Sequence, residues 1–417
     1  MCGRARFAGP ERHGRGDPDG AGASGAAVSG PRLRMNPAFA DLPTTVFEAM
    51  SRLARERGAI NLGQGFPEDP GPLDLREAAA RAVIDGDNQY PPMMGLPVLR
   101  AAIAAHYSRT QGLALDPDRE VMVTSGATEA LAGALLALIA PGDEVVLFEP
   151  MYDAYLPLVL RAGGVPRFVT LQPPHFRIEE AALAAAFTQR TRVVLLNNPL
   201  NPSATVFGAD DLGRLAGYCA RFDAVALCDE VWEHCVFDGA AHVPFMALPG
   251  MRERTVKVGS AGKIFGLTGW KVGFVMAAPA LMSALARAHQ FLTFTTPPNL
   301  QAAVAYGLGK EPASFLSMRD TLARSRDRLA SGLADLGFTV LPSRATYFLN
   351  VDIAPLGHRD DVAFCEVLVR EHGVAAIPVS AFYASDAVRH LVRFCFAKSD
   401  ATLDAALARL APVARAA

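Results

Sequence analysis

The sequence lacks an excess of charge of either sign. Its 40 lysines and arginines are matched by 42 aspartates and glutamates, which leaves a net charge of −2. Proteins that bind nucleic acid or anionic lipid usually carry a basic surface. We therefore expect neither nucleic acid nor a membrane among the partners of this chain.

Long hydrophobic runs and closely paired cysteines are also missing. The longest strongly apolar run, ALAGALLALIA at 130–140, is shorter than the roughly 20 residues of a membrane-spanning helix, so we interpret it as a buried core helix. The six cysteines are scattered, and no two have the CxxC spacing of a zinc or redox site. This pattern is typical of a reducing compartment. We expect a cytoplasmic protein without a metal site.

Residues 1–34 contain many glycines and few large apolar side chains. Such a segment buries too little surface to offset the entropy lost on ordering, so we expect a disordered extension without function. It also lacks the apolar core of a secretory signal. Translation that begins at Met35 is an alternative explanation.

From about residue 75, apolar runs typical of strands alternate with amphipathic helical segments. The strand-like runs are EVMVTS, DEVVLFE, PRFVTL, TRVVLLN, DAVALCDE, TVKVGS and KVGFVMA. Continuous apolar strands separated by helices predict an α/β fold with a mostly parallel sheet that is covered on both faces. Ligands of such sheets bind at the carboxyl ends of the strands.

Two long helical stretches, 279–307 and 311–336, follow the last of these runs. The remaining C-terminal part mixes short strand-like runs with helices. We predict a large domain at 75–310 and a small domain at 311–417, with an N-terminal segment at 35–74 that packs on the small domain.

Polar residues and small-residue turns follow several predicted strands where each strand ends. The turn at 125–128 opens a helix, whose N-terminus is suited to an anion. Asn201 follows a proline turn, and Asp229 and Lys263 come after the next two strands. Each feature alone has an ordinary explanation as a turn, a helix cap or a surface loop. Because the ends of parallel strands meet at one edge, we expect the four to converge.

Lys263 lies in the stretch VGSAGKIFGLTGWKVG, which contains a Gly-Lys pair like that of a nucleotide-binding loop. The Walker pattern fails, because Lys257 stands in place of its first glycine and Ile264 in place of its serine or threonine. A phosphate pocket, a buried carboxylate and a lysine flanked by small residues instead meet the needs of a pyridoxal phosphate enzyme.

Several separate motifs resemble the class I (fold type I) aminotransferases, in particular the kynurenine/glutamine and methionine aminotransferase branch. They run from about Pro43 to the C-terminus and are NLGQGFPEDPGP, NQYPPMMGLPVLR, TSGATEAL, EPMYDAY, NNPLNPSATVF, CDEVWEH, GSAGKIFGLTGWKVG and HLVRFCFAK. LQPPHFR and HGVAAIPVS are similar to methionine aminotransferases. The resemblance implies transfer of the α-amino group of a methionine-, glutamine- or aromatic-type amino acid to a 2-oxo acid, in a ping-pong cycle on pyridoxal phosphate.

Carried over to this sequence, the resemblance makes Lys263 the Schiff-base lysine and the base that moves the substrate α-proton. It implies that Asp229 pairs with the pyridine nitrogen of the cofactor and that Asn201 hydrogen-bonds its 3′-oxygen. Tyr152 would stack on the cofactor ring. The residues that would hold the phosphate are Ala127, Thr128, Ser260 and Lys271.

The resemblance also implies a substrate site and a partner. Arg393 would bind the substrate α-carboxylate in a bidentate pair, and the backbone of Gly65 would meet the same group. Tyr90 would reach the phosphate of a neighbouring subunit, and Phe294 would reach its pocket. These two residues imply an obligate homodimer with active sites shared across the interface.

Two positions depart from the family. Trp232 stands where the family usually has a tyrosine that hydrogen-bonds the 3′-oxygen. An indole N–H can donate but cannot accept or ionise, so we expect altered electronics of a bound cofactor. Thr44 and Thr45 stand near the position where kynurenine-type members have a pocket tryptophan. The loss of that ring favours methionine or glutamine over bulky aromatic substrates.

Other functions remain open. A β-lyase acting on cysteine S-conjugates, a synthase that releases a γ-leaving group and an N-succinyldiaminopimelate-type aminotransferase would all use the same cofactor residues. A non-catalytic binding or regulatory protein is disfavoured, because Lys263, Asp229 and Arg393 are all present.

Overall fold

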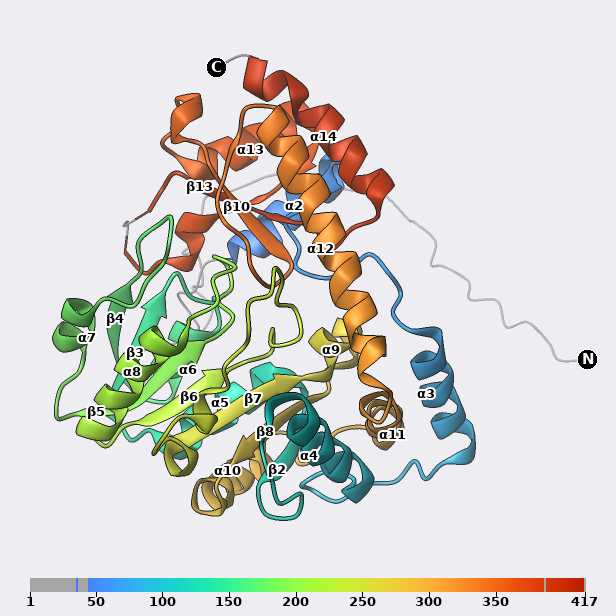
Figure 1. The fold of residues 1–417 in the computed structure, drawn as a ribbon, viewed down its shortest axis with the longest axis vertical. Coiled ribbons are helices and arrows are strands. Elements are labelled where there is room, and N and C mark those ends of the chain that lie inside the picture. Colours follow the sequence, from blue (N-terminus) through green and yellow to red (C-terminus); the bar gives the residue numbers. More distant parts are fainter. Residues whose placement is uncertain (1–34, 37–43, 386–387, 416–417) are drawn as a thin grey trace, which may run out of the picture. The chain divides into compact units, whose positions relative to one another are not determined.

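The computed structural model describes residues 35–36, 44–385 and 388–415. The predicted extension at 1–34 lies outside these residues. From residue 44 onward, the described residues belong to one compact unit (Figure 1).

A seven-stranded sheet forms the larger part of this unit. Its strands are β2 Val121–Thr124, β3 Glu144–Glu149, β4 Val165–Thr170, β5 Thr191–Asn197, β6 Val225–Asp229, β7 Thr255–Ser260 and β8 Gly273–Ala277. The order is β2-β8-β7-β6-β5-β3-β4, and β8 alone runs in the direction opposite to the other six strands. The prediction of a mostly parallel sheet from seven apolar runs is confirmed.

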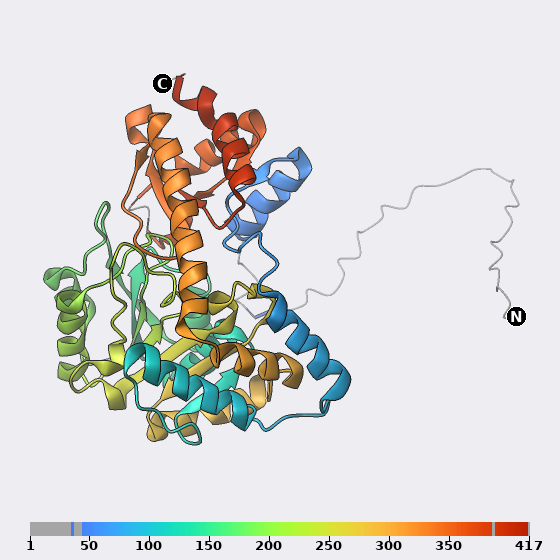
Figure 2. The ribbon, with the colours of Figure 1, turned by 45° about the vertical axis from the view of Figure 1, so that its right-hand side comes forward.

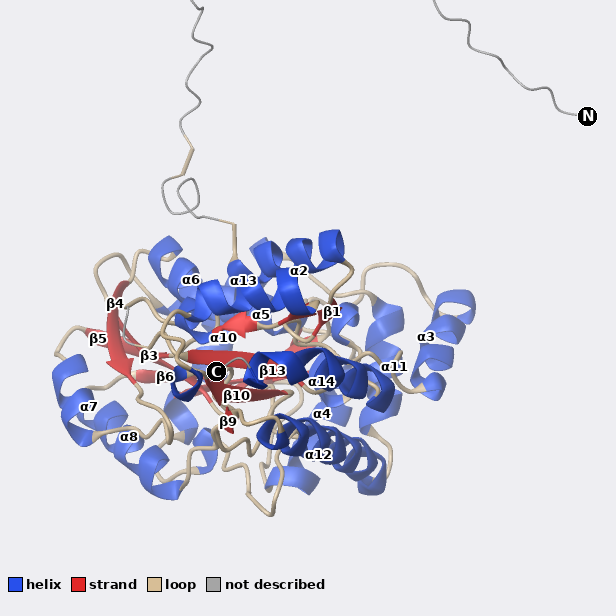
Figure 3. Cartoon of the chain, turned by 90° about the horizontal axis from the view of Figure 1, so that it is seen from above, coloured by secondary structure: helices blue, strands red, loops and turns tan. Residues whose placement is uncertain are grey.

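Helices lie on both sides of this sheet (Figure 3), and alternate residues of its strands belong to two different cores. Val145 and Leu147 of β3 belong to a core that includes residues of α5 Gly126–Leu138 and α6 Tyr155–Arg161. Val146 and Phe148 belong to a second core with residues of α7 Glu180–Ala186 and α8 Ala209–Arg221. Burial on both faces explains the run of consecutive apolar residues in a strand such as β3.

The remaining helices of this part are two that precede the sheet strands in the chain, one short helix between β7 and β8, and two that follow β8. They are α3 Leu73–Asp85, α4 Pro97–Gln111, the short α9 Ala261–Ile264, α10 Pro279–Leu292 and α11 Pro298–Leu308. The predicted helical stretch 279–307 is thus wrong as one helix, because it divides into α10 and α11. Phe294 between them has a left-handed φ of 63°, and Pro297 cannot continue a preceding helix.

The C-terminal part forms a smaller antiparallel sheet. Its strands are β9 Thr339–Val340, β10 Phe348–Asp352, β12 Ile377–Pro378 and β13 Leu391–Cys395, in the order β12-β13-β10-β9. The helices are α12 Pro312–Asp335, which is long and steep in Figure 2, α13 Asp361–His372 and α14 Asp400–Arg415. Of the two predicted helical stretches, 311–336 is therefore a single helix.

The N-terminal segment packs on this C-terminal part. Helix α2 Val46–Arg57 is followed by β1 Ile60–Asn61, which pairs in parallel with β11 Val374–Ala375. We propose on this basis that the segment belongs to the small domain, and the boundaries at 74 and 310 stay predictions. None of the helices in the described part of the chain is long and apolar enough to cross a membrane. The five cysteines in that part are buried and unpaired.

Candidate active site

A cavity of about 190 Å³ opens at the carboxyl ends of β5, β6 and β7. Nine of the predicted site residues line it, namely Ala127, Thr128, Tyr152, Asn201, Asp229, Trp232, Ser260, Lys263 and Lys271. Gly65 lies beside it, with its carbonyl oxygen 3.5 Å from Lys263 Nζ. The structure therefore brings together residues from six of the motifs.

One end of this cavity is suited to an anion. Among the described residues, the side chain of the N-cap residue Ser125 makes no capping hydrogen bond, although Glu129 Oε2 accepts from the backbone N–H of Ser125 at 3.1 Å. N–H groups of the first turn of α5 are therefore available to a ligand. A β-carbon on Gly126 would stand 3.2 Å from Lys271 Nζ, which places an ammonium against the same turn. Strand β8 packs directly on the turn, because a β-carbon at Gly273 would stand 2.4 Å from a backbone carbon of Gly126.

Asp229 ends β6 in the cavity with 5% of its surface exposed. Burial raises the pKa of its carboxyl, and a hydrogen bond from Tyr155 acts in the opposite direction. The phenol of Tyr155 donates to Oδ2 at 2.6 Å, and the N–H of Val231 approaches Oδ1 at 3.4 Å. Such a carboxylate can pair with a cationic ring nitrogen.

Lys263 is carried by α9, directly after β7. Burial lowers the pKa of its amine to about 8, so a share of the amine is neutral near neutral pH and can act as a nucleophile or base. Its Nζ lies 4.5 Å from the ring centroid of Trp232 and 5.6 Å from that of Tyr347. Tyr347 also donates a hydrogen bond to the backbone oxygen of Lys263 at 3.2 Å. Trp232, which replaces the usual tyrosine of the family, therefore contacts the reactive amine.

Arg393 of β13 is buried beside the cavity. Its guanidinium donates to Asn201 Oδ1 at 2.8 Å and to the carbonyl of Gly63 at 3.0 Å, while its Nε has no hydrogen-bond partner among the described residues. Burial lowers the pKa of the guanidinium to about 9. A buried guanidinium with a free donor is suited to a carboxylate ligand.

Aromatic rings surround this guanidinium. Its carbon lies 3.8 Å from the ring centroid of Phe348, 4.8 Å from Phe382 and 5.3 Å from Phe47. Sequence analysis missed Phe47 on α2 and considered only Thr44 and Thr45, which are exposed. Phe47 therefore places an aromatic ring beside Arg393, and the preference for methionine or glutamine drawn from Thr44 and Thr45 stays a prediction.

Tyr90 and Phe294 do not line the cavity of their own chain. Their rings contact each other edge to face, with centroids 5.8 Å apart. Tyr90 is 84% exposed and Phe294 is 40% exposed.

Two hydrogen-bonding residues of the site were not predicted. Asn197, the last residue of β5, donates to the backbone oxygen of Asp229 at 2.8 Å and accepts from the backbone N–H of Asn201 at 2.8 Å. Applied to TRVVLLN, the strand-end argument that found Asp229 would have found Asn197. Tyr155 lies in EPMYDAY, three residues after Tyr152, but nothing in that motif shows which tyrosine meets the carboxylate.

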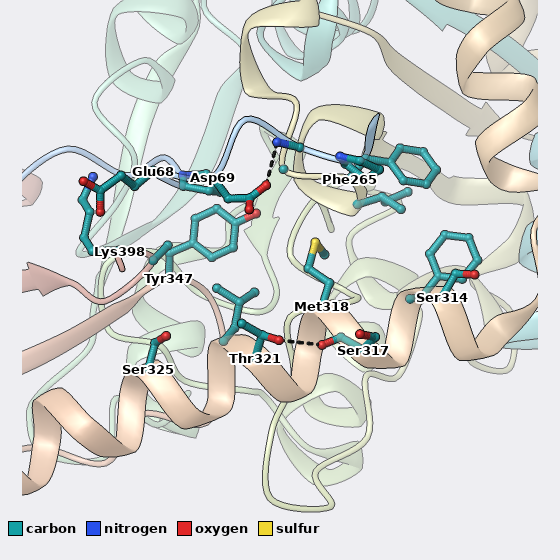
Figure 4. Close-up of a pocket in the computed structure, with 18 of the residues that line it drawn as sticks. Glu68, Asp69, Phe265, Ser314, Ser317, Met318, Thr321, Ser325, Tyr347 and Lys398 are labelled. Atoms are coloured by element: carbon teal, nitrogen blue, oxygen red, sulfur yellow. Dashed lines mark hydrogen bonds between the residues drawn. The ribbon is translucent and has the colours of Figure 1, made fainter. Parts of the chain in front are cut away.

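A larger cavity of about 650 Å³ lies beside the turn that follows Lys263 (Figure 4). Ile264 and Phe265 line it, together with a row of hydroxyl side chains on α12 and the ring of Tyr347. None of the predicted site residues lines it. The smaller cavity is therefore the candidate active site, and Tyr347 connects the two through its bond to Lys263.

Known proteins share both the sequence and the fold. The family described as aminotransferase class I and II matches residues 57–410. A methionine aminotransferase of Escherichia coli is 44% identical over 88% of this chain and 96% of its own length. Human kynurenine–oxoglutarate transaminase 1 is 37% identical over 85% and 92%. The structure of an N-succinyldiaminopimelate aminotransferase from Mycobacterium tuberculosis superposes with a TM-score of 0.89 at 45% identity, covering 91% of this chain and 100% of that one. The chain belongs to the class I and II aminotransferase family, and it is an amino acid aminotransferase.

Proposed function

We propose that this aminotransferase takes the amino group from an amino acid with an uncharged, apolar side chain, methionine above all, and passes it to a 2-oxo acid through bound pyridoxal phosphate. One observation carries the proposal. The amine of Lys263, the buried carboxylate of Asp229 and the anion-binding turn at Gly126 border a single cavity, and Arg393 lies beside it.

The residues of this cavity fit pyridoxal phosphate. The glycine turn at Gly126, with Lys271 Nζ against it, leaves space and donors for a phosphate. The proposed phosphate ligands are Ala127, Thr128, Ser260 and Lys271. When bound, the cofactor supplies an electron-accepting ring that stabilises the charge left on the substrate after loss of its α-proton.

The other predicted residues would orient this ring. Asp229 would hold a proton on the ring nitrogen, since its carboxylate is buried and points into the cavity. The side-chain oxygen of Asn201 already accepts from Arg393, which leaves its amide N–H groups to donate to the 3′-oxygen. Tyr152 would cover one face of the ring.

Lys263 and Arg393 would act on the substrate. Arg393 binds the α-carboxylate and so holds the α-carbon near Lys263. Lys263 Nζ, whose pKa burial lowers to about 8, would take the proton from the substrate α-carbon. Trp232 lies against this amine and excludes water from one side of it.

The charges near the cavity favour an uncharged substrate side chain. The cations among its described lining residues are Lys263 and Lys271, and both have proposed roles. Asp153 adds a carboxyl group close enough to Arg393 to feel its charge. Phe47 and Phe382 offer aromatic rings, and a thioether sulfur makes favourable contacts with such rings.

An N-succinyldiaminopimelate-type substrate is a second candidate, favoured by the 45% identical structure. Its distal carboxylates would need further cations, which among the described residues the cavity lining does not offer. A β-lyase reaction on cysteine S-conjugates stays an alternative, because it would use the same residues.

We also propose a homodimer. Phe291 and Tyr90 are each 84% exposed, and Phe291 lies shortly before Phe294 in the chain. A cluster of exposed aromatic side chains is typical of a surface that a partner covers. In the dimer, Tyr90 and Phe294 would complete the site of the partner.

A donor panel tests the proposal. The purified protein with pyridoxal phosphate is assayed with methionine, glutamine, phenylalanine, kynurenine and N-succinyldiaminopimelate against several 2-oxo acids, and Lys263→Ala is the control. We expect methionine to give the highest kcat/KM. A higher value for the succinylated donor would support the second candidate. Release of pyruvate from cysteine conjugates without amino transfer would support the lyase.

A further inference from the structure

Tyr155 touches two of the residues proposed to hold the cofactor. It is the first residue of α6, is 2% exposed and lines the candidate active site. Its phenol donates to Asp229 Oδ2 at 2.6 Å. Its ring meets that of Tyr152 edge to face, with centroids 5.7 Å apart and planes at 79°. One buried side chain thus joins the carboxylate to the ring proposed to stack on the cofactor.

We propose that Tyr155 is a positioning residue, which rests on the proposed function: its phenol fixes the orientation and charge of the Asp229 carboxylate, and its ring supports Tyr152. Tyr155 itself makes no contact with the substrate in this proposal.

The contacts of Asp229 show why the phenol matters. Among the described residues, Oδ2 receives the short hydrogen bond from Tyr155, whereas Oδ1 has only the 3.4 Å contact with the N–H of Val231. Oδ1 is therefore the oxygen left to meet a ring nitrogen. Without the phenol, one long contact would remain to fix the rotation of the carboxylate.

The charge state of Asp229 depends on the same bond. Burial raises the pKa of this carboxyl, and the hydrogen bond from Tyr155 lowers it. Loss of the phenol therefore raises the pKa further. The titratable groups that act on Asp229 or feel its charge are Tyr155, Tyr152, Lys263, Glu230 and Cys228.

Tyr155→Phe removes the phenol and keeps the ring, and its two effects change with pH in opposite directions. The carboxylate needed by the cofactor is lost at higher pH than in the wild type, so the deficit in cofactor affinity grows on acidification. The stability of the apoprotein is instead lowered most at high pH, because Asp229 is ionised there and lacks its hydrogen-bond donor. Protonation relieves this, because a raised carboxyl pKa gives stability that is lost as pH rises through it.

The experiment compares apoproteins of the wild type, Tyr155→Phe and Tyr383→Phe. Tyr383 is a matched control, because its buried phenol donates to the backbone oxygen of Leu171 at 3.1 Å. Tryptophan fluorescence gives the dissociation constant of pyridoxal phosphate, and thermal unfolding gives Tm, both between about pH 5.5 and about pH 8. For Tyr155→Phe we expect affinity about tenfold weaker than wild type at the acid end and about threefold weaker at the alkaline end.

In the same variant, the Tm deficit should be larger at the alkaline end. For Tyr383→Phe, the ratio of its dissociation constant to that of the wild type, and its loss of Tm relative to the wild type, should not change with pH. If both differences are also constant with pH in Tyr155→Phe, the phenol has only a structural role and the proposal is wrong. Adding Asp229→Asn must abolish the pH dependence of the Tm deficit, and its persistence would equally contradict the proposal.

Two further outcomes distinguish the role of the Tyr155 ring from that of its phenol, and both from the proposed function. Tyr155→Leu should bind the cofactor more weakly than Tyr155→Phe at every pH, since it also withdraws support from Tyr152, and equal binding would overturn the role of the ring. If the wild-type protein fails to bind pyridoxal phosphate, the proposed function is wrong. The unfolding data on apoproteins would still decide whether Tyr155 controls Asp229.

Discussion

Arg393 donates a hydrogen bond to the side-chain oxygen of Asn201 at 2.8 Å, and this bond links the C-terminal sheet to the active-site edge of the central sheet. Through its backbone N–H, Asn201 is bonded to Asn197, which in turn donates to the backbone of Asp229. The proposed carboxylate-binding group and the proposed ring-binding group are thus held in one continuous network. A substrate bound by Arg393 is placed relative to the ring by this network.

We expect Arg393→Lys to lower kcat/KM for amino donors about 30- to 100-fold, because an ammonium cannot form the bidentate pair. The change should appear mainly in KM, and cofactor binding should be retained. Steady-state kinetics measures it. Arg328→Lys is a matched control, since Arg328 pairs with Asp404 on the surface and should leave kinetics unchanged. Equal kinetics in Arg393→Lys and wild type would contradict the assignment.

The capture of pyridoxal phosphate by the apoprotein should depend on the amine of Lys263. Because its lowered pKa is about 8, the rate of covalent capture should rise about tenfold per pH unit below pH 8 and level off above it. Stopped-flow absorbance follows this phase. Lys263→Ala should lack it and also lack transamination, with its fold retained. Reduction with borohydride and peptide mapping should find the label on Lys263, and a label on Lys271 would be evidence against this role.

Gly65→Ala should destabilise the protein. A β-carbon there would stand 2.4 Å from the ring of Phe348, and overpacking of this kind lowers the free energy of unfolding by about 1–3 kcal/mol. Gly213→Ala in α8 is the control, because nothing lies within 4 Å of its β-carbon. That change should be neutral or stabilising by up to about 1 kcal/mol. Denaturant unfolding measures the free energy of unfolding of both variants. Equal values would show that Phe348 does not restrict a side chain at Gly65.

Trp232→Tyr should keep the enzyme active and lower the pH at which the visible absorbance of the bound cofactor changes. A phenol would donate a hydrogen bond to the 3′-oxygen of the cofactor more strongly than an indole does. The 3′-oxygen would then hold less tightly the proton that it shares with the nitrogen of Lys263. The position of Trp232, 4.5 Å from Lys263 Nζ, supports an electronic role. Coincident absorbance titrations of the two proteins would show that the indole only fills space.

Much of the fold and part of the site could be predicted because both follow from local patterns. Apolar runs gave the central sheet, and the residues after those runs gave Asp229 and Lys263, since parallel strands end at one edge. Tyr155 and Phe47 could not be found this way. Their roles depend on how α6 and α2 pack against distant parts of the chain, which no local pattern encodes. The break between α10 and α11 was missed, although the consecutive Pro297 and Pro298 mark it in the sequence.

Gly65 and Gly273, near the two ends of the cavity, differ in whether a second mutation can make room for a side chain. At Gly65 the obstacle to a side chain is the ring of Phe348, so a second substitution such as Phe348→Leu can restore the space. At Gly273 the obstacle is the backbone of Gly126, which no exchange of side chains removes. Laboratory selection for new substrates can therefore remodel the end of the cavity near Arg393 through compensating pairs of mutations. Gly273 has no such route, so any variant that keeps the anion-binding turn must keep glycine at this position.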